Sequence, residues 1–370
     1  MMKIGILTFH NSDNYGSVLQ NYALQQYLMV HYNISVEDIN FLPPNSELVN
    51  GYFEKVTSAR KLIKNFVKIS GYQQFKKRQS DFANFRRKYL RISKKVYSEN
   101  NANDIANDYS LVICGSDQIW NTACQDFSWA YYLRNIPVKR KISYGCSMGA
   151  CDFSENDWSV IKPSLSEFDC ISVREQNAVV KILSNTGIVC SCVPDPTFLI
   201  SKQNYEKAAN DRIITGDFIF IYMINMDPDA MKLASDIVSM LDKPAYTIIS
   251  CKDSFKWKSY KNIKFVEDNS PEAFLSYIRD ACIVLTNSFH GTAFSLIFHK
   301  NFYTIGALKN DSRISTILSE LNLTDRAVES VKSVRLDDDI DYESRNDLIN
   351  KVTTTGKIFL DKGLHDEYCV

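Results

Sequence analysis

The apolar and polar residues of this chain repeat one pattern along most of its length. A short apolar run rich in β-branched residues is followed by a polar loop, and then by apolar residues at helical spacing. Bounded apolar runs of this kind predict buried parallel strands, and the spaced apolar residues predict helices that pack on them. The runs lie at residues 3–9, 36–41, 109–115, 141–149, 169–175, 217–223, 245–250 and 282–285.

This order of elements predicts an α/β fold with parallel sheets flanked by helices, and the pattern restarts near the middle of the chain. Residues 194–196 read Pro-Asp-Pro and the segment that follows residue 200 is polar, so we place a boundary there. We expect two Rossmann-like lobes that face each other across a cleft, one formed by 1–200 and one by 201–340. A helical tail, 341–370, is expected to pack back on the first lobe.

A strongly basic stretch, 55–95, forms an insert in the first lobe. Its aromatic residues recur at helical intervals, which predicts a pair of helices with an aromatic packing face and a solvated basic face. The alternative is a docking surface for anionic lipid headgroups or for a pyrophosphate-linked substrate. A peripheral membrane contact through 55–95 is therefore one hypothesis.

The stretch 281–298 contains the most suggestive polar residues. It opens with a predicted buried strand and closes with a predicted buried helix, and Ser288 lies between them as a candidate helix cap. Gly291 lets backbone approach a ligand closely. His290 lies where the strand meets the helix N-terminus, a position that attracts phosphate in open α/β sheets. It is either a catalytic group that moves a proton near neutral pH or a structural histidine.

Polar loops also follow two strands of the first lobe, at the edge of the predicted sheet where ligands bind. Their side chains suit hydrogen bonding to an anion or a sugar, although each aspartate is equally suited to cap a loop or helix. The tryptophan in the second loop either stacks on a sugar ring or packs in the core. The candidates are Asn11, Asp13 and Asn14 in the first loop and Ser116, Asp117 and Trp120 in the second.

Composition narrows the function classes further. The chain carries 43 basic and 43 acidic residues, so a globally basic nucleic-acid-binding protein is not expected. The cysteines and the five histidines show no metal-ligand spacing, and no metal is predicted. No apolar run has the length of a signal peptide or a membrane span. We expect a cytoplasmic protein, located at the inner face of the membrane if the basic stretch docks there; the oligomeric state stays open.

Several motifs, in order along the chain, together resemble the polysaccharide pyruvyl transferase family. They cover residues 3 to about 325 and include Asn14-Tyr-Gly, Gly115-Ser-Asp-Gln-Ile-Trp-Asn121, Ser143-Tyr-Gly, Ile171-Ser-Val-Arg-Glu175, Asp195-Pro-Thr and Asn287-Ser-Phe-His-Gly-Thr-Ala293. The resemblance implies a two-lobed glycosyltransferase-B-like architecture, with the acceptor on the first lobe and the donor on the second. It also implies transfer of the pyruvyl group of phosphoenolpyruvate to two sugar hydroxyls, which forms a cyclic ketal and releases phosphate.

The resemblance assigns roles to matching residues. His290 is implied to be the general acid or a phosphate contact, and Arg174 to hold the anionic groups of the donor. From the residues alone, Arg174 is equally suited to a salt bridge with Glu175 or another neighbour. Asp117 is the candidate base for the attacking hydroxyl. Phosphoenolpyruvate is a co-substrate in this scheme, so no cofactor is expected.

The sequence departs from the family at one position. Studied members carry Arg-Leu-His where this chain has Ser288, Phe289 and His290, and a serine cannot replace a bidentate guanidinium. Either another cation takes over, for which Arg313 is the first candidate and Lys309 the second, or this branch uses a different donor. Arg313 is alternatively a plain surface residue.

Three functions are therefore weighed. The first is pyruvyl transfer to a sugar of a bacterial surface polysaccharide or of its lipid-linked oligosaccharide precursor. The second is a glycosyltransferase with a nucleotide-sugar donor, whose diphosphate would rest on the helix N-terminus near Gly291. The third is a catalytically silent partner in glycan assembly.

Overall fold

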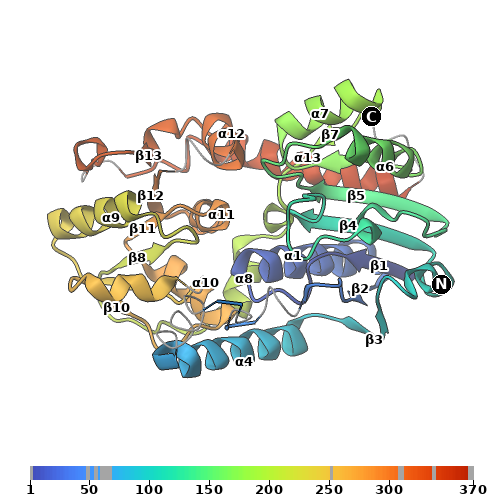
Figure 1. Ribbon diagram of the computed structural model, residues 1–370. Helices are drawn as coiled ribbons and strands as arrows, with labels where there is room; N and C mark the ends of the chain where they lie inside the picture. The colour runs from blue at the N-terminus through green and yellow to red at the C-terminus, as the bar shows by residue number, and fades with distance from the viewer. Residues whose placement is uncertain are drawn as a thin grey trace. The chain divides into compact units, whose positions relative to one another are not determined.

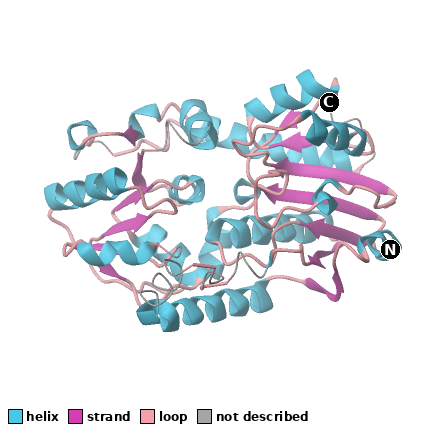
Figure 2. Cartoon of the chain, viewed as in Figure 1, coloured by secondary structure: helices cyan, strands magenta, loops and turns pink. Residues whose placement is uncertain are grey.

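The computed structural model describes residues 3–46, 51–53, 57–58, 69–250, 253–306, 312–335 and 339–365. The chain forms two compact units. Unit 1 comprises residues 1–51, 86–200 and 350–370, and unit 2 comprises 52–85 and 201–349. In both units, parallel strands are flanked by helices (Figure 2).

Unit 1 contains a seven-stranded parallel sheet in the order β3-β2-β1-β4-β5-β6-β7. Figure 1 shows β4 and β5 side by side and pointing the same way. The order reverses between β1 and β4, which is the topological switch point of a doubly wound sheet. The strands are β1 (Lys3–Leu7), β2 (Ser35–Phe41), β3 (Ile92–Tyr97), β4 (Leu111–Asp117), β5 (Arg140–Cys146), β6 (Ser172–Val173) and β7 (Ser191–Cys192).

The sheet of unit 1 has a hydrophobic core on each face, because successive strand residues point to opposite sides. Ile4 and Ile6 of β1 join one core, whereas Leu7 joins the other. Residues of α1 and α13 complete the first core, and residues of α6 and α7 complete the second. The helices of this unit are α1 (Tyr15–Tyr32), α5 (Ile105–Asp108), α6 (Glu155–Leu165), α7 (Gln176–Thr186) and α13 (Asn346–Leu364), which begins within unit 2.

Unit 2 repeats the architecture with six parallel strands in the order β10-β9-β8-β11-β12-β13. Its switch point lies between β8 and β11. The strands are β8 (Ile219–Tyr222), β9 (Ala245–Thr247), β10 (Ile263–Phe265), β11 (Ile283–Thr286), β12 (Asn301–Ile305) and β13 (Ala327–Val328). The helices are α8 (Lys202–Ala208), α9 (Pro228–Leu241), α10 (Pro271–Asp280), α11 (Phe289–Ile297) and α12 (Ser312–Glu320), together with most of α4 (Tyr72–Tyr89).

The structure changes the sequence-based picture of the basic stretch 55–95. Its residues 92–95 are not helical but begin β3, which pairs with β2 at the edge of the sheet of unit 1. An edge strand leaves its lysines in solvent, so it lacks the apolar run that marks a buried strand. Residues 72–85 of the same stretch belong to unit 2. Residues 54–56 and 59–68 lie outside the described residues.

The C-terminal helix α13 joins the core of unit 1 through Phe359 and Leu360. A Cβ atom at Gly356 would lie 2.2 Å from the hydroxyl oxygen of Tyr144, so the glycine permits the close contact. Arg140 at the start of β5 donates a 2.6 Å hydrogen bond to the carbonyl oxygen of Gly363. Helix α13 therefore completes the unit that β1 begins.

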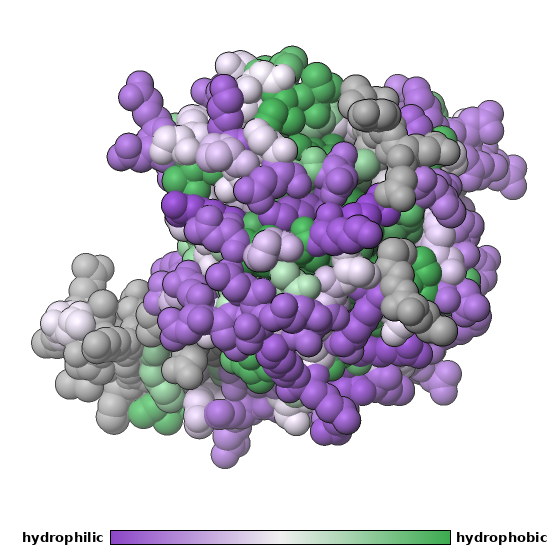
Figure 3. All heavy atoms as spheres, turned by 90° about the vertical axis from the view of Figure 1, so that its right-hand side faces the viewer, coloured by the Kyte–Doolittle hydropathy of each residue, from purple (hydrophilic) through white to green (hydrophobic). Residues whose placement is uncertain are grey.

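Because apolar side chains on both faces of each sheet are buried, a surface of mostly polar residues is expected. The face shown in Figure 3 is mostly hydrophilic, with apolar residues in separate patches. Among the described residues, no helix has both the length and the apolar character that crossing a membrane requires.

Gly291 allows helix α11 to pack directly on the sheet of unit 2. A Cβ atom at this position would lie 2.2 Å from Oγ1 of Thr286 and 3.0 Å from Cδ1 of Tyr222. We predict that Gly291→Ala lowers the free energy of unfolding by about 1–3 kcal/mol, the usual cost of overpacking. Urea denaturation measures this. Because Thr286→Ala removes the nearest atom, the double variant should cost less than the sum of the two single changes. Strictly additive costs would contradict the packing role.

Candidate functional site

A buried ion pair lies at the carboxyl edge of the sheet of unit 1. Arg174, which follows β6, contacts Asp195 through its guanidinium, and both side chains are almost fully buried. A second carboxylate, Asp117 at the end of β4, lies 3.9 Å from the Arg174 guanidinium. This is the salt-bridge alternative for Arg174, with Asp195 and Asp117 as neighbouring carboxylates. Direct contact of Arg174 with a donor stays a prediction.

Asp195 also organises the backbone around it. Its Oδ1 accepts a 2.9 Å hydrogen bond from the backbone N–H of Thr197, which caps a short 3₁₀ helix. Its Oδ2 lies 3.3 Å from the hydroxyl oxygen of Ser116, which also donates to the carbonyl oxygen of Gly145. Ser116 is fully buried, so its place in this structure is within the network and not on a surface that meets a sugar. The expectation of an acceptor contact by Ser116 is not retained.

Asp117 has an unusual backbone. Its φ is +71°, in the left-handed region that non-glycine residues seldom adopt and that is common at functional sites. The carboxylate accepts hydrogen bonds from the hydroxyl of Ser17 and, at 2.9 Å, from the backbone N–H of Gln118. The side chain stays partly accessible, at 15%. Asp117 thus presents an oriented carboxylate at the switch point of unit 1, as a base or a hydroxyl ligand requires.

The loop after β1 is tied to its own surroundings. Asn14 caps α1 by accepting hydrogen bonds from the backbone N–H groups of Gly16 and Ser17. Asp13 forms a 3.0 Å ion pair with Arg86. These are the capping and loop roles that the sequence offered as alternatives. Asn11 is exposed, and an acceptor contact by Asn11, Asp13 or Asn14 stays a prediction.

Trp120 belongs to the core. It is fully buried, its ring stacks on Tyr132 at a centroid distance of 4.9 Å, and its Nε1 donates a 2.9 Å hydrogen bond to the carbonyl oxygen of Tyr131. The assignment of Trp120 to sugar stacking is corrected accordingly. A tryptophan that begins a connection next to a sheet buries more apolar area by packing inward.

In unit 2, strand β11 leads into helix α11 at the switch point, as the sequence predicts. Ser288 is the N-cap residue by position, although its side chain makes no capping hydrogen bond. Instead Oγ1 of Thr286 accepts from the backbone N–H of Ser288 and donates to the carbonyl oxygen of Tyr222 at the end of β8. Asn287 bonds Ile224 and Asn225 in the loop that follows β8. Side-chain hydrogen bonds therefore link the ends of β8 and β11 at the switch point.

His290 occupies the first turn of α11 and is 8% exposed. Backbone N–H groups in a first helical turn have no intrahelical acceptor, and the helix dipole favours an anion there. Arg313, near the start of α12, places its guanidinium carbon 5.4 Å from the centre of the Phe289 ring. A cation therefore lies next to the residue that precedes His290. Lys309, the second candidate, lies outside the described residues.

The structure groups the predicted residues by unit. Ser116, Asp117 and Arg174 belong to unit 1, where Arg174 lies beside Asp117, and Ser288, His290, Gly291 and Arg313 belong to unit 2, where Arg313 lies over Phe289. Gly291 has a packing reason of its own, because Thr286 fills the space beside its α-carbon. Sequence reasoning missed Ser17 and the role of Asp195. Asp195 could have been found from the sequence, because it lies in Pro-Asp-Pro and begins the family motif Asp195-Pro-Thr.

Two buried ionisable groups of unit 1 were also missed. Burial raises the pKa of the Asp38 carboxyl to about 8, although hydrogen bonds from Asn21 and Gln25 act in the opposite direction. Burial lowers the pKa of the His10 imidazole to about 4, and its Nε2 lies 3.2 Å from Oδ1 of Asn40. At neutral pH both side chains are therefore mainly uncharged.

These shifts predict opposite effects of pH on stability. Folded Asp38 keeps its proton up to about pH 8 whereas the unfolded group loses it near 3.8, so stability falls as pH rises between these values. Unfolded His10 gains a proton below 6.5 that the folded group binds only near 4, so stability falls as pH drops through that range. Urea denaturation across this pH span measures both effects. Asp38→Asn should reduce the loss of stability as pH rises, and His10→Gln should reduce the loss of stability as pH falls. Unchanged profiles of stability against pH would contradict these two pKa shifts.

Within the described ranges, no group of three or more His, Cys, Asp or Glu side chains is arranged to hold a metal ion. The polar clusters at both switch points consist of hydroxyls, carboxylates, an imidazole, guanidinium groups and backbone N–H groups. Such groups bind anions and sugar hydroxyls and transfer protons.

A family model described as polysaccharide pyruvyl transferase matches residues 14–307 of the chain. No curated protein matches its sequence. A putative UDP-N-acetylglucosamine 2-epimerase from Listeria monocytogenes has a similar structure, with a TM-score of 0.55 at 8% identity over 95% of this chain and 91% of that chain. UDP-GlcNAc 2-epimerase from Methanocaldococcus jannaschii gives 0.53 at 12% identity over 95% and 92%. The enzyme from Neisseria meningitidis bound to UDP-GlcNAc gives 0.51 at 10% identity over 99% and 100%.

At these identities the likeness concerns the fold alone. Two parallel, helix-flanked sheets confirm the expected two-lobed α/β fold of the glycosyltransferase-B type.

Proposed function

Because this chain belongs to the polysaccharide pyruvyl transferase family, we propose that it transfers the pyruvyl group of phosphoenolpyruvate to two hydroxyls of one sugar. The products are a cyclic ketal and inorganic phosphate. The family is one of transferases that act on polysaccharide, and the proposal specifies the donor and the bond formed. The acceptor is a sugar of a bacterial surface polysaccharide or of its lipid-linked precursor, and the reaction takes place in the cytoplasm.

The observation that carries the proposal is the position of His290 in the first turn of α11, at the switch point of unit 2. Phosphoenolpyruvate brings a phosphate and a carboxylate, which the N–H groups of this turn are suited to bind. An imidazole beside them is suited to give a proton to the methylene carbon of the donor.

The reaction balances without a cofactor. Protonation of the methylene carbon produces a methyl group and an oxocarbenium-like carbon, to which the first sugar hydroxyl adds and loses its proton to a base. Cleavage of the bond between this carbon and the phosphate oxygen releases phosphate. The second hydroxyl then adds, loses its proton and closes the ketal ring. We assign the base to Asp117, whose carboxylate is oriented by Ser17 and Gln118.

Arg313 is proposed to supply the cation that Ser288 cannot. Its guanidinium lies against Phe289, one residue before His290, and is suited to a bidentate contact with the phosphate or carboxylate of the donor. Charge-assisted hydrogen bonds contribute about 1.5–3 kcal/mol. We predict that Arg313→Gln raises the KM for phosphoenolpyruvate about tenfold to hundredfold and changes kcat less.

The matched control for Arg313 is Arg212→Gln. Arg212 also belongs to unit 2, but it binds the carbonyl oxygens of Ile214 and Gly216 in an exposed loop. This variant should keep the wild-type KM. Equal KM values in both variants and the wild type would remove Arg313 from the donor site.

The reaction itself is tested with phosphoenolpyruvate labelled with ¹³C at its second carbon. The enzyme is incubated with a panel of sugars, glycans and lipid-linked oligosaccharides, and NMR follows the labelled carbon. The proposal expects a ketal carbon signal together with equimolar phosphate for at least one acceptor class. Transfer of sugar from a nucleotide sugar to the same panel, without any ketal, would instead establish the glycosyltransferase alternative.

A further inference from the structure

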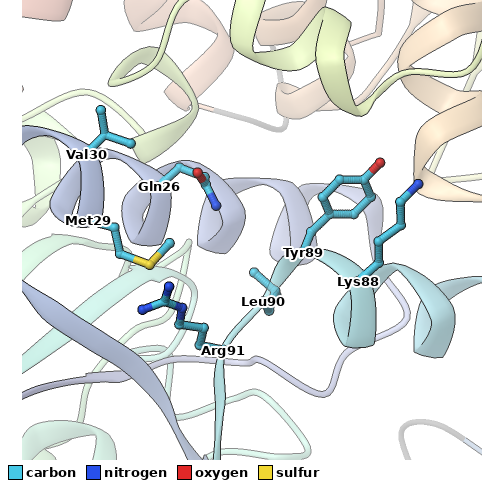
Figure 4. Close-up of a pocket in the computed structure, with 7 residues that line it drawn as sticks. All are labelled: Gln26, Met29, Val30, Lys88, Tyr89, Leu90 and Arg91. Carbon is cyan, nitrogen blue, oxygen red and sulfur yellow. The ribbon is translucent and has the colours of Figure 1, made fainter.

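A surface groove of about 380 Å³ lies in unit 1, away from the carboxyl edge of the sheet. One wall comes from the second half of α1, and the other from the chain that leaves α4 and enters β3. Figure 4 shows Arg91 reaching towards Met29 at one end and Lys88 beside Tyr89 at the other. The lining residues are Gln26, Met29, Val30, Lys88, Tyr89, Leu90 and Arg91.

The groove combines positive charge with one exposed apolar side chain, Val30. Its lining contains two cations and no carboxylate. The ten residues from Arg86 to Lys95 contain six basic residues and no acidic one, within a chain whose net charge is zero. Arg86 pairs with Asp13, and Lys95 pairs with Asp104 and Asp108. Both cations of the groove, Lys88 and Arg91, are exposed.

The lining of the groove also contains apolar side chains. Val30, near the C-terminal end of α1, is 75% exposed. Met29 lies next to it, and Tyr89 offers a ring with a polar tip, over which the ammonium group of Lys88 lies at 4.7 Å from the centroid. Apolar side chains beside cations and an interfacial tyrosine are typical of surfaces that enter the headgroup layer of a membrane.

We propose that this groove docks on an anionic phospholipid surface. Lys88 and Arg91 meet lipid phosphates, and Val30 enters the boundary between headgroups and acyl chains. The exposed valine favours a membrane over a nucleic acid, because a nucleic acid offers phosphates but no apolar layer. The membrane contact that was one hypothesis for 55–95 is thus assigned to the end of that stretch. This assignment does not depend on the identity of the donor.

The test is co-sedimentation of the full chain with phosphatidylcholine vesicles, with and without phosphatidylglycerol. Each basic residue near an anionic surface is expected to change partitioning about fivefold, so Lys88→Gln/Arg91→Gln should bind about 25-fold more weakly. The matched control is Lys139→Gln/Lys162→Gln, which removes two exposed charges from unit 1 outside the groove. It should bind like the wild type.

A second pair of variants tests the apolar contact. Val30→Asp should weaken vesicle binding, whereas Val180→Asp, at a valine of α7 that is 59% exposed, should leave it intact. Equal binding to neutral and anionic vesicles, or equal loss in the two double variants, would overturn the proposal. Binding to single-stranded RNA that requires Lys88 and Arg91, without vesicle binding, would overturn it as well. Neither donor nor acceptor enters this assay, so its result is independent of the proposed reaction.

Discussion

His290→Asn should lower the rate of phosphate release from phosphoenolpyruvate by about two to four orders of magnitude. This is the usual contribution of a positioned general acid. Asparagine keeps a hydrogen-bond donor of similar size but cannot transfer the proton to the methylene carbon. The variant should therefore fold and still bind the donor, with the loss confined mainly to kcat. Steady-state assays with the acceptor found by the labelling experiment measure this.

The chain offers a matched control in His299. This histidine follows the same helix, α11, at its C-terminal end, where it is exposed and stacks on Tyr342 at 4.6 Å. Its φ of +54° is one that asparagine tolerates. His299→Asn should keep nearly full activity. Comparable rates in the two variants would remove His290 from the chemistry.

Asp195→Asn should lower the free energy of unfolding by about 3–5 kcal/mol, because it leaves the guanidinium of Arg174 buried with less compensating charge. The matched control is Asp104→Asn. Asp104 pairs with Lys95 at 3.3 Å in the same unit, but both side chains are nearly half exposed, so the expected cost is at most about 1 kcal/mol. Urea denaturation compares the two variants.

The same experiment separates a charge pair from general packing. If the cost arises from the unpaired guanidinium, Arg174→Met combined with Asp195→Asn should be less destabilising than the sum of the single variants. Asp195 is a positioning residue in this account, because it acts through Arg174 and Ser116. Equal costs for Asp195→Asn and Asp104→Asn would contradict that role.

The sequence predicted the central strands well, because buried parallel strands carry continuous apolar runs. Ile283–Thr286 and Leu111–Asp117 are strands within two residues of the predicted bounds. It failed at β3, whose sequence Ile-Ser-Lys-Lys-Val-Tyr lacks such a run because it lies at an edge. It also gave no sign that 72–85 pack with unit 2, since contacts between distant segments leave no local pattern.

The sequence predicted which loops form the candidate site, but it did not predict which of their side chains contact each other. The strand-to-helix position of His290 follows from local pattern, whereas the pairing of Arg174 with Asp195 depends on two loops brought together by the sheet. Trp120 was ambiguous because a loop tryptophan has the same sequence signal whether it packs inward or outward. Gly291 was read as backbone access for a ligand, and the structure adds the contact with Thr286.

The donor is the central claim, and isothermal titration calorimetry of the wild-type protein tests it most directly. Phosphoenolpyruvate and a panel of nucleotide sugars are titrated separately, and no acceptor is needed. The account predicts saturable binding of phosphoenolpyruvate that weakens in Arg313→Gln and persists in His290→Asn, with no comparable binding of any nucleotide sugar. Saturable binding of a nucleotide sugar, with none of phosphoenolpyruvate, would contradict it.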